Sequence, residues 1–339
     1  MSEIAIIGAG AWGTALSIVA GRSGTHRVRL WAHEKEVRES VEARHVNDLF
    51  LPGQAIPESV HASNDLAEAL RGADIVVSVM PSNHCRRLFE SMRPFLRPEM
   101  LFVSATKGLE DGSLSRMTEV ITQVLCPDRN FALRIGAMSG PSFAKEVARA
   151  DPTAIAIASS DTELSQTVQQ ALSDPRFRLY TNQDVVGVEL GGSLKNVIAI
   201  AAGVCDGLGF GHNSVAALIT RGLAEMTRLV VACGGQRETM SGLAGLGDLV
   251  LTCTGGLSRN RSVGVELGRG RQLPEIIAGM HGMVAEGVLT TNAAVGLAKS
   301  YGVEMPITAK MHGILHEGKS PREAMHELMT RSAKSETGL

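Results

Sequence analysis

The stretch that decides the fold lies near the start of the chain, where residues 4–16 read IAIIGAGAWGTAL. An apolar run typical of a buried strand passes through three glycines into a helix-forming segment. Gly8 permits a tight turn, Gly10 lets the backbone approach a pyrophosphate without a Cβ in the way, and Gly13 lets the helix pack against the strand. The flanking strand and helix favour a dinucleotide-binding turn over an ordinary glycine turn, with the pyrophosphate at the helix N-terminus.

The composition indicates a protein with a large apolar interior and no general affinity for polyanions. The chain has 339 residues, of which 44% are hydrophobic, so we expect two domains. Lys and Arg number 33 against 35 Asp and Glu, and the net charge of -2 argues against a nucleic-acid partner. Five cysteines without a Cys-x-x-Cys pair indicate reduced thiols rather than disulfides or a zinc site.

The sequence favours a cytoplasmic protein without membrane insertion. The first predicted strand begins by Ile4, which leaves no room for a secretion signal. No apolar run approaches the roughly 18 residues of a membrane span.

The first half of the chain alternates apolar runs with segments of helical spacing. The apolar runs cover residues 28–31, 74–81, 100–103, 135–138, 153–158 and 177–180, and helical spacing covers residues 65–70 and 114–125. Such alternation predicts an α/β fold with a mainly parallel, doubly wound sheet of the Rossmann type. From about Asp184 the chain is rich in Ala, Leu, Met and Gly, which predicts a mostly α-helical second domain. We expect a dinucleotide-binding domain at residues 1–186 and a helical substrate and catalytic domain at residues 187–339.

The corner after the second predicted strand bears on the choice of dinucleotide. An NAD site usually has a carboxylate directly after this strand, to bind the ribose 2′-hydroxyl. Here the corner reads Trp31-Ala32-His33-Glu34, with Lys35 and Arg38 nearby. This favours NADP, or the use of both NADP and NAD, although His33 is also compatible with a plain solvent-facing loop.

Two motifs follow predicted strands and therefore lie at the edge where α/β sheets bind ligands. Lys107 lies in the motif ATKGL at residues 105–109, and a surface loop lysine is the alternative. In the motif SGPSFAKE at residues 139–146, we expect Pro141 at the first position of a helix and Glu146 in its opening turns. Backbone N–H groups at such a helix start can bind substrate or nucleotide, and a merely well-capped helix is the alternative.

A lone lysine stands on a small-residue face in the second half. Gly191, Lys195, Ala199 and Gly203 recur at helical i, i+4 spacing. Each helical glycine costs about 1 kcal/mol relative to alanine, so this face needs a packing or ligand reason. A partly desolvated lysine with other cations nearby loses its proton more readily, which suits an acid and base. The alternative is a lysine paired with Glu189 at a domain interface.

A glycine-rich turn at residues 242–250 carries Asp248, and the motif Ser-Arg-Asn-Arg follows at residues 258–261. An unpaired carboxylate in an apolar setting is costly, so we expect a cationic or hydroxyl partner for Asp248. Ser258 is suited to cap a helix, which would place Arg259 and Asn260 at its positive end. Arginine binds phosphate oxygens in a bidentate fork, so Arg259 is a candidate phosphate ligand.

The pair His312 and His316 has metal-ligand spacing but no suitable third ligand. We therefore expect an amphipathic helix at this pair and no metal site.

Taken together, these motifs resemble those of the bacterial-type NAD(P)-dependent glycerol-3-phosphate dehydrogenases, and the resemblance covers nearly the whole chain. The most specific motifs are ATKGLE, SGPSFAKE, LKNVIAIAAG and AGLGDLVLTCT followed by SRNR. The resemblance implies hydride transfer between NADPH or NADH and dihydroxyacetone phosphate, giving sn-glycerol 3-phosphate for phospholipid synthesis. One alternative is a dehydrogenase of the β-hydroxyacid or ketopantoate reductase type, which also has a lysine on a domain-joining helix but does not require Ser258-Arg259-Asn260. The other is a non-catalytic dinucleotide sensor, which does not require Lys195.

The resemblance also assigns residues. It implies that Lys195 is the catalytic proton donor and acceptor, oriented by Asp248 and Asn196. The implied substrate contacts are Lys107, Gly140, Ser142, Lys195, Asp248, Ser258, Arg259 and Asn260. The implied nucleotide contacts, beside Gly8, Gly10 and Gly13, are Ala11, Trp12, His33, Phe50, Lys107, Ala144, Arg259, Val284 and Glu286. Phe50 stands where the family commonly has a tyrosine, which removes a hydroxyl. The Ala-, Leu- and Met-rich helices lead us to expect a homodimer.

Overall fold

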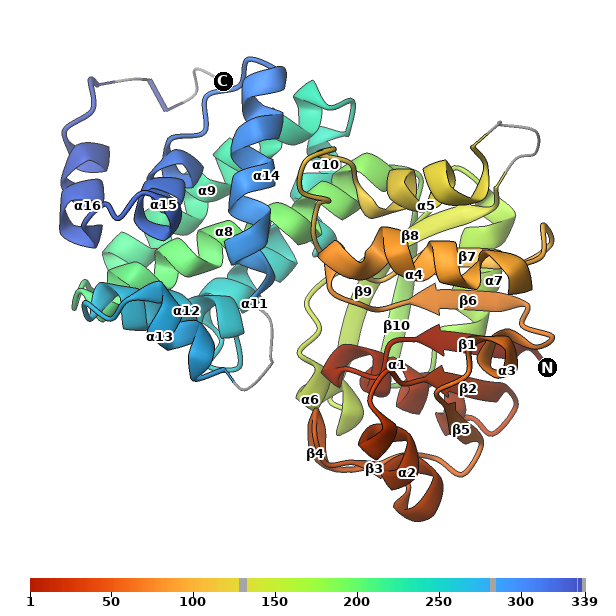
Figure 1. Cartoon of the computed structure of the whole chain (residues 1–339). Coiled ribbons are helices and arrows are strands. Elements are labelled where there is room, and N and C mark those ends of the chain that lie inside the picture. Colours follow the sequence, from red (N-terminus) through yellow and green to blue (C-terminus); the bar gives the residue numbers. More distant parts are fainter. Residues whose placement is uncertain (128–132, 281–284, 334, 337–339) are drawn as a thin grey trace. The chain divides into compact units, whose positions relative to one another are not determined.

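The computed structural model describes residues 1–127, 133–280, 285–333 and 335–336 (Figure 1). The chain forms two compact units. Unit 1 contains Met1–Thr106 and Met117–Val185, and unit 2 contains Lys107–Arg116 and Val186–Leu339. The short loop Lys107–Arg116 therefore packs with unit 2, although unit 1 precedes and follows it in sequence.

Unit 1 is built on a mainly parallel sheet, as predicted. In the described part of the chain it has eight strands in the order β10-β9-β8-β7-β6-β1-β2-β5 (Figure 1). Its strands are β1 (Glu3–Ile7), β2 (Arg27–Trp31), β5 (Val60–Ser63), β6 (Ile75–Ser78), β7 (Leu101–Ser104), β8 (Ile135–Ser139), β9 (Thr153–Ala158) and β10 (Phe177–Asn182). Neighbouring strands run parallel except β8 and β9, which are antiparallel. The sequence did not predict β5 or the small hairpin of β3 (Val46–Asn47) and β4 (Leu51–Ala55).

Helices cover both faces of this sheet, which explains why its strands read as continuous apolar runs. Along β1, Ile4 and Ile6 face a core that contains Leu16, whereas Ala5 and Ile7 face a second core that contains Phe89. The helices of unit 1 are α1 (Ala11–Arg22), α2 (Lys35–Arg44), α3 (Leu66–Leu70), α4 (Cys85–Met92), α5 (Met117–Leu125), α6 (Ala144–Ala148) and α7 (Thr162–Leu172).

Two predicted helix starts in unit 1 were wrong. The helix expected from residue 114 begins at Met117, because Leu114 has a φ of 60° and lies in the loop that packs with unit 2. The helix expected at Pro141 begins at Ala144. Gly140 has a φ of 152°, and the Ser142 hydroxyl donates to the Gly140 carbonyl over 2.9 Å, so this segment forms a turn instead.

Apart from the loop Lys107–Arg116, the described residues of unit 2 are mostly helical, as the sequence predicted. Its helices are α8 (Val185–Gly207), α9 (His212–Ala232), α10 (Arg237–Met240), the π-helical turn η3 (Leu243–Gly247), α11 (Asp248–Thr254), α12 (Arg259–Gly268), α13 (Leu273–Ala278), α14 (Glu286–Ser300), α15 (Pro306–His316) and α16 (Pro321–Met329). Every residue of α8 from Gly187 to Cys205 is buried, so α8 is the central helix of this unit.

The length and hydropathy of α8 would allow it to cross a membrane, with a mean hydropathy of 1.4, but 89% of the apolar window is buried in the fold. A bent helix pair, Arg237–Thr254 with Arg259–Gly268, meets the same compositional test in the described chain. The sequence analysis predicted that no apolar run approaches membrane length. This holds for runs without charged residues, because the charged residues Glu189 and Lys195 interrupt the apolar sequence of α8.

Small residues on α8 allow other helices to approach its backbone. A Cβ added to Gly203 would lie 2.0 Å from the carbonyl oxygen of Arg261, and one added to Gly264 would lie 2.0 Å from that of Ile200. Helices α8 and α12 therefore touch through reciprocal glycines. This is the packing reason that the glycines on the Lys195 face required.

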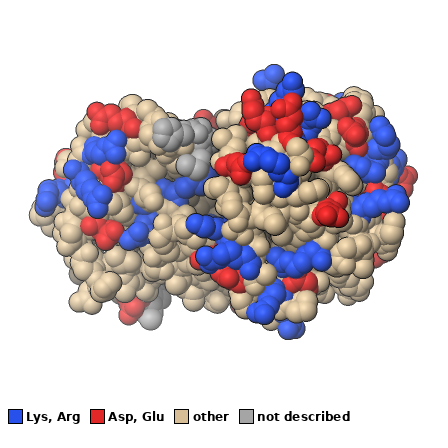
Figure 2. Space-filling view, turned by 90° about the horizontal axis from the view of Figure 1, so that it is seen from below, with Lys and Arg blue, Asp and Glu red and all other residues tan. Residues whose placement is uncertain are grey.

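The surface carries mixed charge, as the nearly neutral composition leads one to expect. On the face drawn in Figure 2, Lys and Arg side chains are interspersed with Asp and Glu. All five cysteines are free thiols.

Candidate active site

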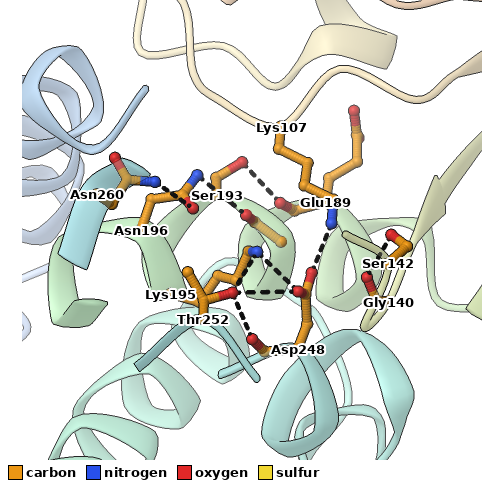
Figure 3. Close-up of polar contacts among 11 residues, drawn as sticks. Lys107, Gly140, Ser142, Glu189, Ser193, Lys195, Asn196, Asp248, Thr252 and Asn260 are labelled. Atoms are coloured by element: carbon orange, nitrogen blue, oxygen red, sulfur yellow. Dashed lines mark hydrogen bonds and ion pairs between the residues drawn. The ribbon is translucent and has the colours of Figure 1, made fainter. Parts of the chain in front are cut away.

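A cluster of two lysines and one aspartate lies in unit 2 (Figure 3), in which Lys195 and Asp248 are buried and Lys107 is partly buried. Lys195 Nζ, from α8, donates to Asp248 Oδ1 over 2.7 Å. Lys107 Nζ, from the loop Lys107–Arg116, donates to Asp248 Oδ2 over 2.7 Å. Lys195 Nζ also donates to Thr252 Oγ1 over 2.7 Å, and Thr252 Oγ1 in turn donates to the Asp248 carbonyl. The predictions that Asp248 has a cationic or hydroxyl partner and that Lys195 has another cation nearby are confirmed.

The turn before α11 places Asp248 in this cluster. The N–H of Asp248 bonds to the carbonyl of Leu243, five residues earlier, which makes η3 a π-helical turn. Such turns insert one extra residue and change the direction of the side chains that follow. Gly245 is required here, because its Cβ would lie 2.2 Å from the Met240 carbonyl oxygen. Asp248 then begins α11, and Thr252 follows one turn later on the same face.

The contact between α8 and this turn also depends on a glycine. A Cβ on Gly191 would lie 2.7 Å from the carbonyl oxygen of Ala244. Gly191 and Lys195 are one turn apart on α8, and Ala244 and Asp248 are four residues apart across the turn. The close approach of the two backbones therefore aligns the ammonium group with the carboxylate.

Burial and charge set the protonation of the cluster. Burial lowers the pKa of Lys195 to about 8, with the Lys107 ammonium adding to this effect and the Asp248 carboxylate opposing it. Burial alone would raise the pKa of Asp248, but the two ammonium groups hold it below its ordinary value. At neutral pH the aspartate is ionised, and the Lys195 amine is mainly protonated, within about one pH unit of its pKa.

In unit 1, the glycine turn between β1 and α1 has the geometry that a dinucleotide needs. Gly8 has a φ of 117°, and a Cβ on Gly13 would lie 1.8 Å from the Gly8 carbonyl oxygen. A Cβ on Gly10 would have no heavy atom within 4 Å among the described residues, so the space beside this backbone is open.

Two further observations fit a bound pyrophosphate group. No side chain caps α1 at Gly10, so the N–H groups of its first turn are available to an anion. The indole Nε1 of Trp12, in this first turn, is buried without a hydrogen-bond partner in the part of the chain that is described. The residues present therefore fit a dinucleotide, which the α1 N-terminus would hold by its phosphates.

Comparison with known proteins identifies the family of this chain. Residues 3–165 and 184–326 match the models of the NAD-dependent glycerol-3-phosphate dehydrogenase N-terminus and C-terminus. A glycerol-3-phosphate dehydrogenase (NAD(P)+) of Koribacter versatilis (strain Ellin345) is 68% identical over 339 residues, which is 100% of both chains. A protein of the same name from Acidobacterium capsulatum is 55% identical, over 99% of this chain and 100% of its own. The crystal structure of glycerol-3-phosphate dehydrogenase from Coxiella burnetii is similar with a TM-score of 0.92 and 43% identity, covering 97% of this chain and 99% of that one.

The chain belongs to the NAD-dependent glycerol-3-phosphate dehydrogenase family. Within this dehydrogenase the glycine turn falls in the first matched range, and Lys195, Asp248 and Arg259 fall in the second.

A second polar network of the dehydrogenase begins at Asn196, next to Lys195. Asn260 Nδ2 donates to Asn196 Oδ1 over 3.0 Å (Figure 3). The N–H of Gly287 donates to Asn260 Oδ1 over 2.9 Å. The expectation that Asn196 orients Lys195 is therefore not met, because its amide is bonded to Asn260. Thr252 bonds to Lys195 instead, and the sequence analysis missed it. Its i+4 spacing from Asp248 was the available signal.

Beside this network lies the start of α12. Ser258 Oγ accepts the N–H of Arg261 over 3.2 Å, which confirms the predicted helix cap. Arg259, the first residue of α12, is exposed, and Glu286 at the start of α14 interacts with it electrostatically. The alternative of a Lys195–Glu189 pair is wrong, since Lys195 is paired with Asp248, and Glu189 forms an ion pair with Arg116.

Around the glycine turn, the dehydrogenase uses a residue that the sequence analysis missed. Asn47 is buried, and its Nδ2 donates to the Ala9 carbonyl over 2.8 Å and to Thr14 Oγ1 over 2.7 Å. Its Oδ1 accepts the N–H of Phe50. Asn47 thus links the turn to the segment that carries Phe50. An asparagine two residues into a short strand gives no recognisable sequence signal.

The remaining candidate residues of unit 1 lie on several segments. Ala11, Trp12, Phe50 and Ala144 are partly buried against one core cluster. His33 is exposed beyond β2, with its ring centroid 6.1 Å from that of Trp31. Gly140 and Ser142 form the turn after β8. Val284 lies outside the described residues.

Proposed function

We propose that this chain interconverts dihydroxyacetone phosphate and sn-glycerol 3-phosphate with Lys195 as the acid and base. The family is NAD(P)-dependent, and the bound nicotinamide supplies or accepts the hydride at C2 of the substrate. The observation that carries the role of Lys195 is its buried amine, which donates hydrogen bonds to Asp248 and Thr252. Burial lowers the pKa of this amine to about 8.

The ammonium group has the right number of donors for this role. A protonated lysine has three N–H groups, and among the described residues Asp248 Oδ1 and Thr252 Oγ1 accept two of them. The third is left for the substrate oxygen. As the carbonyl oxygen at C2 gains negative charge during reduction, Lys195 gives it this proton. In the reverse direction the neutral amine takes the hydroxyl proton.

The neighbouring residues keep this proton transfer possible near neutral pH. Ionised Asp248 stabilises the ammonium form and fixes its direction, and Lys107 prevents that stabilisation from raising the pKa of Lys195 too far. A general acid works best when its pKa lies near the working pH.

The proposal assigns substrate binding to the residues that the resemblance implied. Arg259 and Asn260 stand in the first turn of α12, a ten-residue helix capped by Ser258, where the helix dipole favours a phosphate dianion. Lys107 adds a further cation, and Gly140 and Ser142 are retained as proposed substrate contacts. The residues proposed for the coenzyme are Gly8, Gly10, Ala11, Trp12, Gly13, His33, Phe50, Lys107, Ala144, Arg259, Val284 and Glu286. We retain residues 1–186 and 187–339 as the nucleotide and catalytic domains.

The test is a spectrophotometric assay with dihydroxyacetone phosphate, run once with NADPH and once with NADH. Lys195→Ala should lower kcat about 10² to 10⁴-fold because the general acid is lost, while coenzyme affinity stays nearly unchanged. Lys310→Ala, which removes a partly exposed lysine paired with Glu327 in the same unit, is the control and should keep full turnover. Retained turnover in Lys195→Ala would refute the assignment.

The proposal also includes a cytoplasmic homodimer that supplies glycerol 3-phosphate for phospholipid synthesis and binds no nucleic acid. Exposed apolar side chains of unit 2 support self-association, among them Val231 (43% exposed) and Ile277 (47%). The net charge of -2 supports the absence of a nucleic-acid partner. Sedimentation equilibrium of the purified chain would test the dimer.

A further inference from the structure

Backbone hydrogen bonds connect the two ends of the loop Lys107–Arg116. Leu109 and Arg116 form an antiparallel β-bridge. Inside it, the N–H of Glu110 donates to the Ser115 carbonyl over 2.9 Å, and the N–H of Leu114 donates to the Glu110 carbonyl over 3.0 Å. A shift of the backbone at Arg116 is therefore passed to Leu109, and from there to Lys107 two residues away.

Each end of this loop has an ion pair with a buried carboxylate of unit 2. At its start, Lys107 is bound to Asp248. At its end, Arg116 Nη1 lies 2.7 Å from Glu189 Oε2, and the two side chains are only 16% and 4% exposed. Glu189 lies on α8, six residues before Lys195. The helix that carries the acid and base therefore also carries the anchor of the loop.

We propose that the Arg116–Glu189 ion pair is a positioning device for the reaction, which fastens the loop Lys107–Arg116 to α8 and so keeps the Lys107 ammonium on Asp248. This inference rests on the function proposed above. Arg116 and Glu189 are positioning residues, and they act through Lys107 on Lys195.

Apolar contacts keep the loop attached without this ion pair. Leu109 is buried in the core of unit 2, and Leu114 packs against that core beside Gly296 of α14. Such contacts are non-directional, whereas an arginine–carboxylate pair fixes the direction of the backbone beside α8. Removing the ion pair should thus displace Lys107 without detaching the loop.

The charge of Lys107 makes this displacement measurable. The groups that act on the Lys195 amine are Asp248, Lys107, Thr252 and Cys253. Of these, the Lys107 ammonium lowers the pKa of Lys195 and Asp248 raises it. If Lys107 moves away, Asp248 acts on Lys195 alone and the ammonium form persists to higher pH. Reduction needs that form, so its activity should fall off at higher pH than in the parent enzyme.

The experiment measures the pH profile of kcat/KM for dihydroxyacetone phosphate in the full-length chain. Arg116→Gln should move the midpoint of the alkaline limb upward by about 0.5 to 1 pH unit and raise KM roughly threefold or more. Arg116→Lys keeps the charge, so its alkaline limb should shift less than that of Arg116→Gln. If the single change impairs folding, the double variant Arg116→Gln with Glu189→Gln leaves neither buried charge unpaired and should show the same shift.

A double-mutant cycle that combines Arg116→Gln with Lys107→Ala tests whether Arg116 acts through Lys107. Lys107→Ala alone should also move the limb upward, and adding Arg116→Gln to it should produce no further shift. An equal shift in both backgrounds, or no shift in Arg116→Gln, would overturn the inference. If Lys107→Ala moves the limb and Arg116→Gln does not, the proposed function stands and only this inference fails. If Lys195→Ala keeps its turnover, the proposed function itself fails.

A matched control separates positioning from general destabilisation. Arg22 and Asp174 form an ion pair of the same 2.7 Å within unit 1, with side chains 24% and 15% exposed. Arg22→Gln should lower the thermal midpoint of unfolding but leave the alkaline limb unchanged. A limb that shifts equally in Arg22→Gln would mean that lost stability, rather than lost positioning, causes the effect.

Discussion

The glycine turn of unit 1 and the lysine cluster of unit 2 use the same residue type for opposite purposes. At Gly10 the missing Cβ leaves open space, so that a ligand can approach the backbone. At Gly191, Gly203 and Gly264 the missing Cβ lets one part of the protein occupy that space. The first arrangement keeps a surface free for binding, and the second brings side chains together for chemistry. The role of a glycine in this dehydrogenase therefore depends on which atoms lie next to it in the folded structure.

Replacing Asp248 tests the lysine cluster of unit 2 and should have the largest effect on activity. Asp248→Asn keeps the shape but removes the charge that stabilises the Lys195 ammonium. The pKa of Lys195 should then fall further below about 8, because burial and Lys107 are no longer opposed. At pH 7 the proton donor is then largely neutral, and kcat for reduction should fall about 100-fold or more. The alkaline limb should move to lower pH, and a limb that moves upward would contradict the cluster's electrostatics.

The pH profile of the parent enzyme also tests the protonation of Lys195. The amine of Lys195 has a pKa of about 8, so kcat/KM for reduction should fall above this pH as the proton is lost. Oxidation of glycerol 3-phosphate needs the neutral amine, and its rate should rise through the same pH. If the rates of reduction and oxidation both rose, or both fell, through this pH, a single group could not be acting as both acid and base.

A pair of glycine variants compares the two uses of glycine directly. Gly203→Ala forces a Cβ to 2.0 Å from the Arg261 carbonyl oxygen and should lower the free energy of unfolding by about 1 to 3 kcal/mol. Gly10→Ala meets nothing within 4 Å among the described residues, so the fold should keep its stability. Its methyl group would obstruct the pyrophosphate, and coenzyme affinity should fall about tenfold. Chemical denaturation and coenzyme titration measure the two effects, and the comparison fails if both variants behave alike.

The smallest expected effect is that of Thr252→Val, which keeps the volume but removes the acceptor for Lys195 Nζ. One hydrogen bond that orients the ammonium is lost, while Asp248 still holds it. We expect kcat to fall about 3- to 10-fold, with coenzyme affinity unchanged. Thr254→Val on the same helix, where the side chain is exposed, is the control and should have no effect on kcat.

The sequence predicted those features that are local in the chain. The glycine turn, the individual buried strands and the Ser258 cap each depend on residues within a few positions of one another, and all three are present. It also predicted that Asp248 needs a cationic or hydroxyl partner, because burying an unpaired charge is costly whichever residue supplies that partner.

Features that depend on distant partners were not predicted. Nothing near Asn196 in sequence shows that its amide is bonded to Asn260, 64 residues away. The loop Lys107–Arg116 packs with unit 2 through contacts to α8 and α11, so the helix expected from residue 114 starts later. Strand β5 is short and carries a histidine and a serine, so its apolar pattern was too weak to recognise.

The link made by Asn47 has a consequence for the thermodynamics of coenzyme binding. Its amide fixes the carbonyl of Ala9 and the hydroxyl of Thr14, so the glycine turn already has its binding conformation once the chain has folded. The conformational entropy of this turn is then lost during folding rather than on association. Such preorganisation lets a flexible, glycine-rich segment bind a charged ligand without first having to become ordered.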